Sequence, residues 1–369
     1  MKLQFAFDGI IGNVLASHFQ ADCQAAVITT KFRLYYLIRP WLPIPFRQRL
    51  QQCRNSTLAH GEDWYIPKQF LSDLRDACQI LAENRAFEST DHVGSQRVIH
   101  PWPNDHPYAV SLTHDIETAD GVSRVLALAE IEEKLGLRSA WYFVPHLYHL
   151  DMGLLEELKR RGHEVGVHGY NHDGRLFVAH SIFQRRVAPI NAAGKRFQAD
   201  GFRAPMVHRN LQWMQAFQFD YDASCFDIDP FQPMPGGVGG VWPFMAGKLV
   251  ELPYTLPQDH TLMITLGQSA YESWVAKLNL LKRLAGMAML ITHPDYLTTG
   301  DRINQYRRFC EHVASQPDSP WLCLPRDIAM WWRIRQASSI GNDGSVRGPA
   351  SVRGRMVELT KLFQGLSND

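Results

Sequence analysis

The 369-residue sequence lacks several features that would place it in a special class of protein. No run approaches the ~20 consecutive apolar residues that a transmembrane helix needs. The N-terminus has no uninterrupted apolar segment followed by a small-residue cleavage site, so we expect neither a secretory signal nor a membrane span and predict a cytoplasmic protein. With 38 basic and 37 acidic residues, the chain has no overall field to attract nucleic acid, and we expect no such partner.

Paired cysteines are also absent. The six cysteines are scattered without a Cys-x-x-Cys pair, which argues against a thiolate zinc site and against a dense disulfide framework. Reduced thiols are the simpler interpretation, at Cys23, Cys53, Cys78, Cys225, Cys310 and Cys323.

What the chain does have is enough apolar sequence, 45%, to bury a sizeable core. We predict an N-terminal appendage of mixed and helical character over residues 1–100, a catalytic domain over 101–335, and a flexible tail with a short helix over 336–369. The tail prediction rests on its Ser/Gly-rich composition.

The appendage contains a basic and aromatic stretch, residues 31–50, that could lie on a membrane surface. The alternative is an extension packed against the main domain, because prolines at positions 40, 43 and 45 divide the stretch and leave it without one clean amphipathic face.

From residue 108 onward, short apolar runs alternate with segments of helical period. Strands are expected at 108–113, 139–144, 163–167, 221–225, 249–252, 287–292 and 321–324. Helices are expected at 121–135, 154–158, 179–197, 211–217, 271–284, 303–313 and through residue 331. This alternation predicts an α/β fold, either a distorted (β/α) barrel of about seven strand-helix units or a doubly wound sheet.

Three chemically active segments favour the barrel. Asp115, His168 and His293 fall at or just after the carboxyl ends of predicted strands, where the active sites of barrels gather. Asp115 and Glu117 lie two residues apart, so in an extended segment they point to the same side. Alternatively, these two acids have no catalytic role and are only favourable charges near the N-terminus of the following helix.

His168 and His172 have the i, i+4 spacing of a metal-binding pair, although 16 histidines make such a pair easy to obtain by chance. Gly169 and Gly174 allow the backbone to turn tightly, so both imidazoles could converge on one ion together with a carboxylate.

Arg203 and His293 would complete a catalytic site. The arginine could orient a catalytic carboxylate and lower its pKa, or form only a surface salt bridge. The histidine could be a general acid that protonates a departing amine, or a hydrogen-bonded core residue.

This ordered series resembles the polysaccharide deacetylase family, the NodB-homology carbohydrate esterases of family 4, over about 60% of the chain, from Tyr108 to Arg333. The resemblance implies a distorted barrel and metal-dependent removal of an acetyl group from an N- or O-acetylated sugar, and we expect that sugar to be a precursor in polysaccharide or glycolipid metabolism. Zinc is the expected metal, and iron, cobalt or manganese would also suit the ligands.

The resemblance also implies roles, position by position. Asp115 matches the catalytic base, Glu117 a metal carboxylate, His168 and His172 the metal histidines, and Arg203 the arginine that holds the base. His293 matches the general acid, which another aspartate orients; the candidates here are Asp222, Asp227 and Asp229.

The sequence leaves open the roles of the two acids and the class of function. Ile116 separates the two acids of the first motif, so base and ligand could be exchanged between Asp115 and Glu117. An amide or ureide hydrolase, as in allantoinase-like relatives, would use the same metal site. A catalytically inactive carbohydrate-binding protein is the third alternative.

Overall fold

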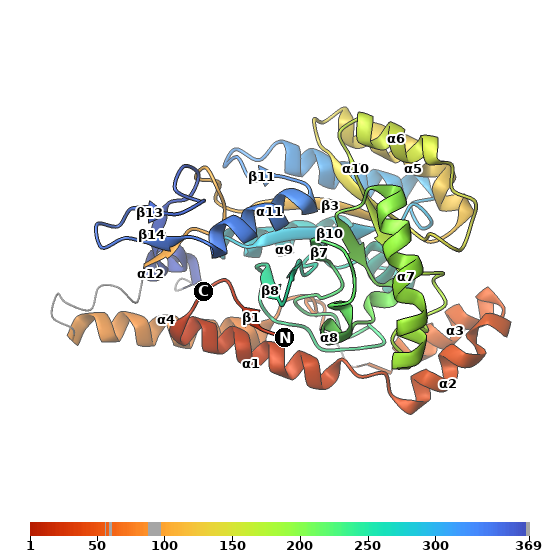
Figure 1. The fold of residues 1–369 in the computed structure, drawn as a ribbon, viewed down its shortest axis with the longest axis horizontal. Coiled ribbons are helices and arrows are strands. Elements are labelled where there is room, and N and C mark those ends of the chain that lie inside the picture. Colours follow the sequence, from red (N-terminus) through yellow and green to blue (C-terminus); the bar gives the residue numbers. More distant parts are fainter. Residues whose placement is uncertain (56, 59–60, 88–96, 367–369) are drawn as a thin grey trace.

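The computed structural model describes residues 1–55, 57–58, 61–87 and 97–366. Figure 1 shows a sheet near the centre, helices around it, and an N-terminal group of helices along one side. The expected α/β architecture is confirmed. Residues 88–96 of the predicted appendage and 367–369 of the predicted tail lie outside the described residues.

The main sheet has ten strands in the order β1-β8-β9-β7-β6-β5-β4-β3-β10, and β11 also pairs with β3. The strands from β10 to β9 along this path run parallel, and β8 pairs in the antiparallel sense with both β9 and the edge strand β1. The parallel strands are β3 (Ala109–Ile116), β4 (Ser139–Phe143), β5 (Glu164–His168), β6 (Gly201–Arg203), β7 (Tyr221–Asp222), β9 (Leu249–Glu251) and β10 (Met287–Thr292). The remaining three are β1 (Leu3–Gln4), β8 (Phe244–Ala246) and β11 (Trp321–Leu322).

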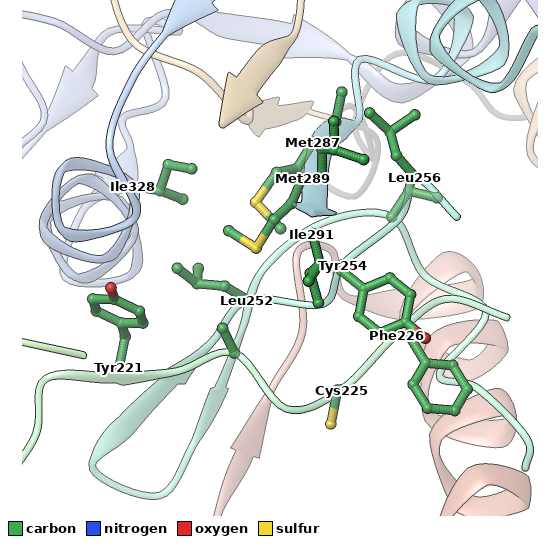
Figure 2. Packing of buried hydrophobic residues seen from close by; sticks show 14 of the residues in the cluster. Tyr221, Cys225, Phe226, Leu252, Tyr254, Leu256, Met287, Met289, Ile291 and Ile328 are labelled. Atoms are coloured by element: carbon green, nitrogen blue, oxygen red, sulfur yellow. The ribbon is translucent and has the colours of Figure 1, made fainter. Parts of the chain in front are cut away.

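The sheet curls into a half-barrel, and the segment after β9 bridges part of the gap to β10. The backbone N–H groups of Thr255 and Leu256 both donate to the carbonyl of Met289 on β10, at 3.2 and 3.1 Å. Figure 2 shows Met287 and Met289 beside Leu252, with Tyr254 and Leu256 nearby in the same buried cluster. Strands β3, β4, β5 and β10 are buried at every position, and the sequences of β4 and β10 are accordingly nearly continuous apolar runs.

The helices that connect these strands lie close to their expected positions. The sequence did not reveal β6 and β8, which are only three residues long, or the π-helix η4 (His260–Leu266). The connecting helices are α5 (Ala119–Glu133), α6 (Met152–Arg160), α7 (His180–Phe197), α8 (Leu211–Met214), α9 (Ala270–Arg283), α10 (Gly300–Ala314) and α11 (Pro325–Gln336), with a short turn η3 (Pro205–Val207) after β6.

The N-terminal region is helical, as expected, but it is also joined to the main sheet. Strand β1 pairs with β8, with Leu3 opposite Ala246, and α1 packs against α4. Its helices are α1 (Gly9–Ala25), α2 (Thr30–Ile38), η1 (Arg39–Trp41), α3 (Ile44–Asn55) and α4 (Lys68–Phe87). None of the described helices is long and apolar enough to cross a bilayer.

The C-terminal segment is packed, in contrast to the flexible tail expected from its composition. Strand β14 (Met356–Glu358) pairs with β2 (Arg97–Ile99), and β12 (Ser339–Ile340) pairs with β13 (Val346–Arg347). The expected short helix is α12 (Leu359–Leu362), followed by η5 (Gln364–Leu366). The Phe363 ring packs edge-on against Phe7, so apolar burial outweighs the local Ser/Gly content.

Candidate active site

The carboxyl ends of four parallel strands bring together the residues that the sequence singled out. Asp115 lies near the end of β3, His168 ends β5, Arg203 ends β6 and His293 follows β10. His168 and Arg203 are direct neighbours in the parallel ladder between β5 and β6. Rigid backbone hydrogen bonding therefore fixes the spacing of these side chains.

Three of the side chains predicted from the sequence form a group that could hold a metal ion. One ligand atom each from Glu117, His168 and His172 lies within 4.8 Å of the others. Nε2 of His172 approaches Oε1 of Glu117 to 2.9 Å, yet this buried nitrogen makes no hydrogen bond of acceptable geometry. Two atoms that face one another in this way suit a shared cation better than a direct bond.

His168 is prepared for metal binding by its surroundings. Its Nδ1 lies 3.2 Å from the backbone carbonyl of Arg203, which selects the tautomer with the proton on Nδ1 and leaves the Nε2 lone pair free. Nε2 is buried and makes no hydrogen bond. Burial lowers the pKa of His168 to about 4, so the imidazole is neutral, as a ligand must be. The donor set fits zinc or a similar divalent ion.

The loop after β5 turns sharply to place the second imidazole. Gly169 has a φ of 65°, and a side chain there would meet Pro205 at 2.3 Å. His172 itself has a left-handed φ of 55°, a conformation that a non-glycine residue adopts only when its surroundings hold it. Arg39 contributes to that hold by donating to the His172 carbonyl at 3.0 Å.

Glu117 is positioned by residues that the sequence did not single out. The Tyr296 hydroxyl donates to Oε2 of Glu117 at 2.9 Å, and the Asp295 carboxylate accepts the Glu117 backbone N–H at 2.9 Å. Burial opposes ionisation of Glu117, but His172 outweighs it and holds the glutamate pKa well below its ordinary value. One carboxylate oxygen is thus fixed by Tyr296 while the other faces the imidazoles.

Asp115 has different partners from Glu117. Arg203 donates to Oδ1 of Asp115 at 2.8 Å and to Thr113 at 2.9 Å, and its guanidinium lies over the Tyr142 ring at 4.4 Å. Burial would raise the pKa of Asp115, but Arg203 and the neighbouring histidines lower it below its ordinary value. Asp115 is therefore an ionised carboxylate beside the metal-binding group, with Oδ2 3.8 Å from Nε2 of His168.

His293 also faces Glu117, with Nε2 3.8 Å from Oε1 of that glutamate. Its Nδ1 is 2.6 Å from Oδ1 of Asp259, and its backbone N–H donates to Oδ2 of the same aspartate at 2.8 Å. Burial works against a charged imidazole, but Asp259 outweighs it and raises the pKa of His293 to about 10. A protonated imidazole with Nε2 facing the site can donate a proton.

The expected aspartate partners of His293 were wrong. Asp222 bonds with Ser224 at 2.7 Å, Asp227 forms a buried ion pair with Lys277, and Asp229 accepts from the Tyr254 hydroxyl at 2.8 Å. Each carboxylate is already paired within the structure around β7 and the segment after it. The residue that holds His293 is Asp259, just before the π-helix.

A signal for Asp259 was present in the sequence. It follows the strand-like run 249–252 by a few residues, so the rule that drew attention to Asp115, His168 and His293 also applied to it. The six residues between them, with prolines at positions 253 and 257, hid this relationship.

Comparison with known proteins gives structural matches. No family model matches the sequence, and no curated protein is significantly similar to it. The structure is similar to that of a protein from Mycobacterium smegmatis described as a polysaccharide deacetylase, with a TM-score of 0.53 and 21% identity over 64% of this chain and 93% of that chain. This chain has the polysaccharide deacetylase fold. The matched share agrees with the roughly 60% expected from the sequence motifs.

Two further structures are more distant. A protein from Pseudomonas aeruginosa PAO1, also described as a polysaccharide deacetylase, has a TM-score of 0.48 and 16% identity over 63% of this chain and 94% of its own. Puue allantoinase has a TM-score of 0.48 and 15% identity over 63% of this chain and 93% of its own.

Proposed function

We propose that this protein is a metal-dependent hydrolase that removes an acetyl group from an acetylated sugar. The observation that carries the proposal is the placement of an ionised carboxylate and a protonated imidazole around one metal-binding group. Asp115 is held by Arg203, and His293 is held by Asp259, 2.6 Å away. Glu117, His168 and His172 lie between these two pairs.

In this proposal Glu117, His168 and His172 hold the ion, with zinc as the default and iron, cobalt or manganese as alternatives. A bound divalent cation supplies a Lewis acid that makes water acidic near neutral pH and stabilises negative charge on a carbonyl oxygen. The partners of the two acids decide which one binds the metal and which one acts as the base. Glu117 faces the imidazoles of the metal-binding group, whereas Asp115 forms an ion pair with Arg203.

Asp115 acts as general base and takes a proton from the attacking water. Arg203 keeps this carboxylate ionised and holds Oδ1, so that Oδ2 remains for the proton. His293 acts as general acid and gives its proton to the leaving nitrogen or oxygen of the sugar, with Asp259 stabilising the imidazolium. Acetate and the deacetylated sugar are the products.

The proposal is tested by metal analysis and acetate release with the full chain. We expect about one zinc per chain and release of acetate from N-acetylglucosamine oligomers. Glu117→Gln should lower metal content, whereas Asp115→Asn should keep the metal and lower acetate release by roughly 10²–10⁴-fold.

Other outcomes would overturn this function. Opening of a cyclic ureide without acetate release would indicate an amide hydrolase of the allantoinase type. Sugar binding without stoichiometric metal, and with no effect of Asp115→Asn on any turnover, would indicate a binding protein.

A further inference from the structure

One end of the molecule carries an exposed apolar stripe. Of the thirteen large apolar side chains that the structure describes as exposed, seven fall within residues 27–50. On α2 and η1 they recur at the i, i+3, i+4 and i+7 positions of a helix, which places them on one face. We define the docking stripe as Leu34, Leu37, Ile38, Trp41, Phe46 and Leu50.

The stripe is the second apolar face of α2. The first face is formed by Phe32 and the buried Tyr36, whose ring packs edge-on against His208 at 4.8 Å. A helix that is already docked through one face has no folding requirement for a second apolar face. Trp41, at the end of the stripe, is nevertheless 77% exposed. Exposed apolar side chains that gather on helix faces in this way are typical of a binding surface.

Charge around the stripe identifies the kind of surface it fits. Residues 23–61 contain six lysines and arginines and no aspartate or glutamate, in a chain whose formal net charge is only +1. Arg39 and Arg54 bond inward to the protein and Arg33 donates to the Ile28 carbonyl at 3.1 Å. Lys31 and Arg49 are exposed on the helices that carry the stripe. Basic residues flanking an apolar helix face are typical of helices that lie in the plane of an anionic membrane.

Helix α2 and the turn η1, which carry part of the stripe, are bonded to the loop of the candidate active site. Arg39 donates to the carbonyl of His172, and Arg175 donates to the carbonyl of Tyr36 at 3.0 Å. Gly174 makes room for α2, since a side chain there would meet the Tyr36 ring at 2.3 Å. Figure 1 shows α2 and α3 at one end of the molecule, beyond α1. The loop that positions a metal ligand and the exposed stripe therefore form one connected unit.

We propose that α2, η1 and α3 dock on an anionic membrane surface and hold the active site over a substrate whose acetylated sugar is attached to a lipid. The substrate part rests on the proposed deacetylase function, and the docking part does not. In this arrangement the apolar stripe enters the headgroup region, Lys31 and Arg49 meet the lipid phosphates, and the loop of His172 faces the sugar.

The docking part is tested with full-length protein and sedimented vesicles. The wild type should bind vesicles containing 30% phosphatidylglycerol and should bind pure phosphatidylcholine far more weakly. A triple variant, Leu34→Ser, Leu37→Ser and Trp41→Ser, should lose at least tenfold in binding. A Lys31→Gln and Arg49→Gln variant should lose about tenfold, and 0.5 M salt should reproduce that loss in the wild type.

A matched control removes equally exposed apolar side chains elsewhere. The variant Leu322→Ser, Met330→Ser and Val352→Ser changes residues that are 43%, 53% and 91% exposed, and it should bind vesicles as the wild type does. Circular dichroism and thermal melting confirm that both triple variants fold.

Two results would overturn the docking. The first is failure of the wild type to bind anionic vesicles, or undiminished binding by the stripe variant. The second is a wild type that is dimeric in lipid-free solution while the stripe variant is monomeric, because a second copy would then cover the stripe.

The substrate part has its own readout. Acetate release from a soluble N-acetylated sugar should be equal in the wild type and the stripe variant, whereas release from the same sugar on a lipid in anionic vesicles should fall at least tenfold in the variant. Loss on both substrates, or on neither, would contradict the lipid-linked substrate. No activity in any form would instead count against the proposed deacetylase.

Discussion

Asp259 binds His293 at two points, through the ring nitrogen Nδ1 and through the backbone N–H. The imidazole is thereby fixed in orientation as well as in charge. Because one carboxylate binds both the ring and the backbone of His293, the proposed general acid is held rigidly. Its position before the π-helix η4 also connects that helix to the chemistry of the site.

Replacement of this aspartate tests the arrangement. Asp259→Asn should lower kcat by roughly 10²–10⁴-fold, because an amide does not stabilise the imidazolium. The pKa of His293 should fall from about 10, so the alkaline limb of the pH–rate profile should move to lower pH. Asp222→Asn is the matched control, and it should leave that limb in place, since Asp222 bonds with Ser224. Equal shifts in both variants would contradict the assignment.

Arg203 is the second test, because it neutralises a carboxylate that is buried with it. Arg203→Met should lower the free energy of unfolding by about 3–5 kcal/mol, since the Asp115 charge remains buried without its partner. Urea unfolding of the metal-free protein measures this loss. Adding Asp115→Asn should recover part of it, and a double variant no more stable than Arg203→Met would count against the pair.

Glu164 should make stability depend on pH. Burial raises the pKa of this glutamate to about 7, from 4.5 for an ordinary glutamate. The folded state then keeps a proton that the unfolded chain loses, so stability should fall as the pH rises from about 4.5 to about 7, by on the order of 3 kcal/mol. Glu164→Gln should match the wild type near pH 4.5 and be more stable at pH 8.

Glu133 provides a control of opposite sign for that experiment. Its pKa is lowered to about 2, first by the hydrogen bonds from Arg161. Glu133→Gln should therefore lose stability at neutral pH relative to the wild type and lose less below pH 2. Thermal unfolding across the pH range measures both variants, and a gain for Glu133→Gln at pH 8 would show that the sign is wrong.

The C-terminal segment gives a prediction about packing. Phe363 is buried against Phe7 and Trp242, so Phe363→Ala should lower the free energy of unfolding by about 3–5 kcal/mol. Val352→Ala, at a position 91% exposed in the same segment, should change stability by less than about 0.5 kcal/mol. Equal effects at the two positions would indicate that the segment contributes little to the fold.

The sequence predicted those elements whose pattern is long enough to be periodic. Strand β10 and helix α7 lie almost where they were expected, since a buried parallel strand is a continuous apolar run and a helix repeats its apolar positions. Strand β6 has three residues and no period, although Arg203 at its end was recognised by chemistry. Such a short strand forms because it pairs with strands that are distant in the sequence, and no local residue pattern predicts that pairing.

In the candidate site too, residues within one local motif could be predicted, whereas a contact between distant segments could not. Glu117, His168 and His172 come from two compact motifs: Asp115 and Glu117 lie two residues apart, and His168 and His172 lie four apart, so the sequence revealed each motif as a unit. Asp259 lies 34 residues before His293, and only the curl of the sheet brings the two into contact. The structure also separates the acids of the first motif, because Arg203 contacts Asp115 whereas the imidazole of His172 faces Glu117.

The pairing of β1 with β8 bears on how this protein can be dissected. A shortened protein that begins near residue 101 would keep the matched fold but lose the strand opposite Met245 and Ala246. It would expose an unpaired sheet edge together with the apolar surface under α1, and such edges invite association between copies. Failure of the shortened protein to stay in solution would therefore say nothing about whether its catalytic residues work.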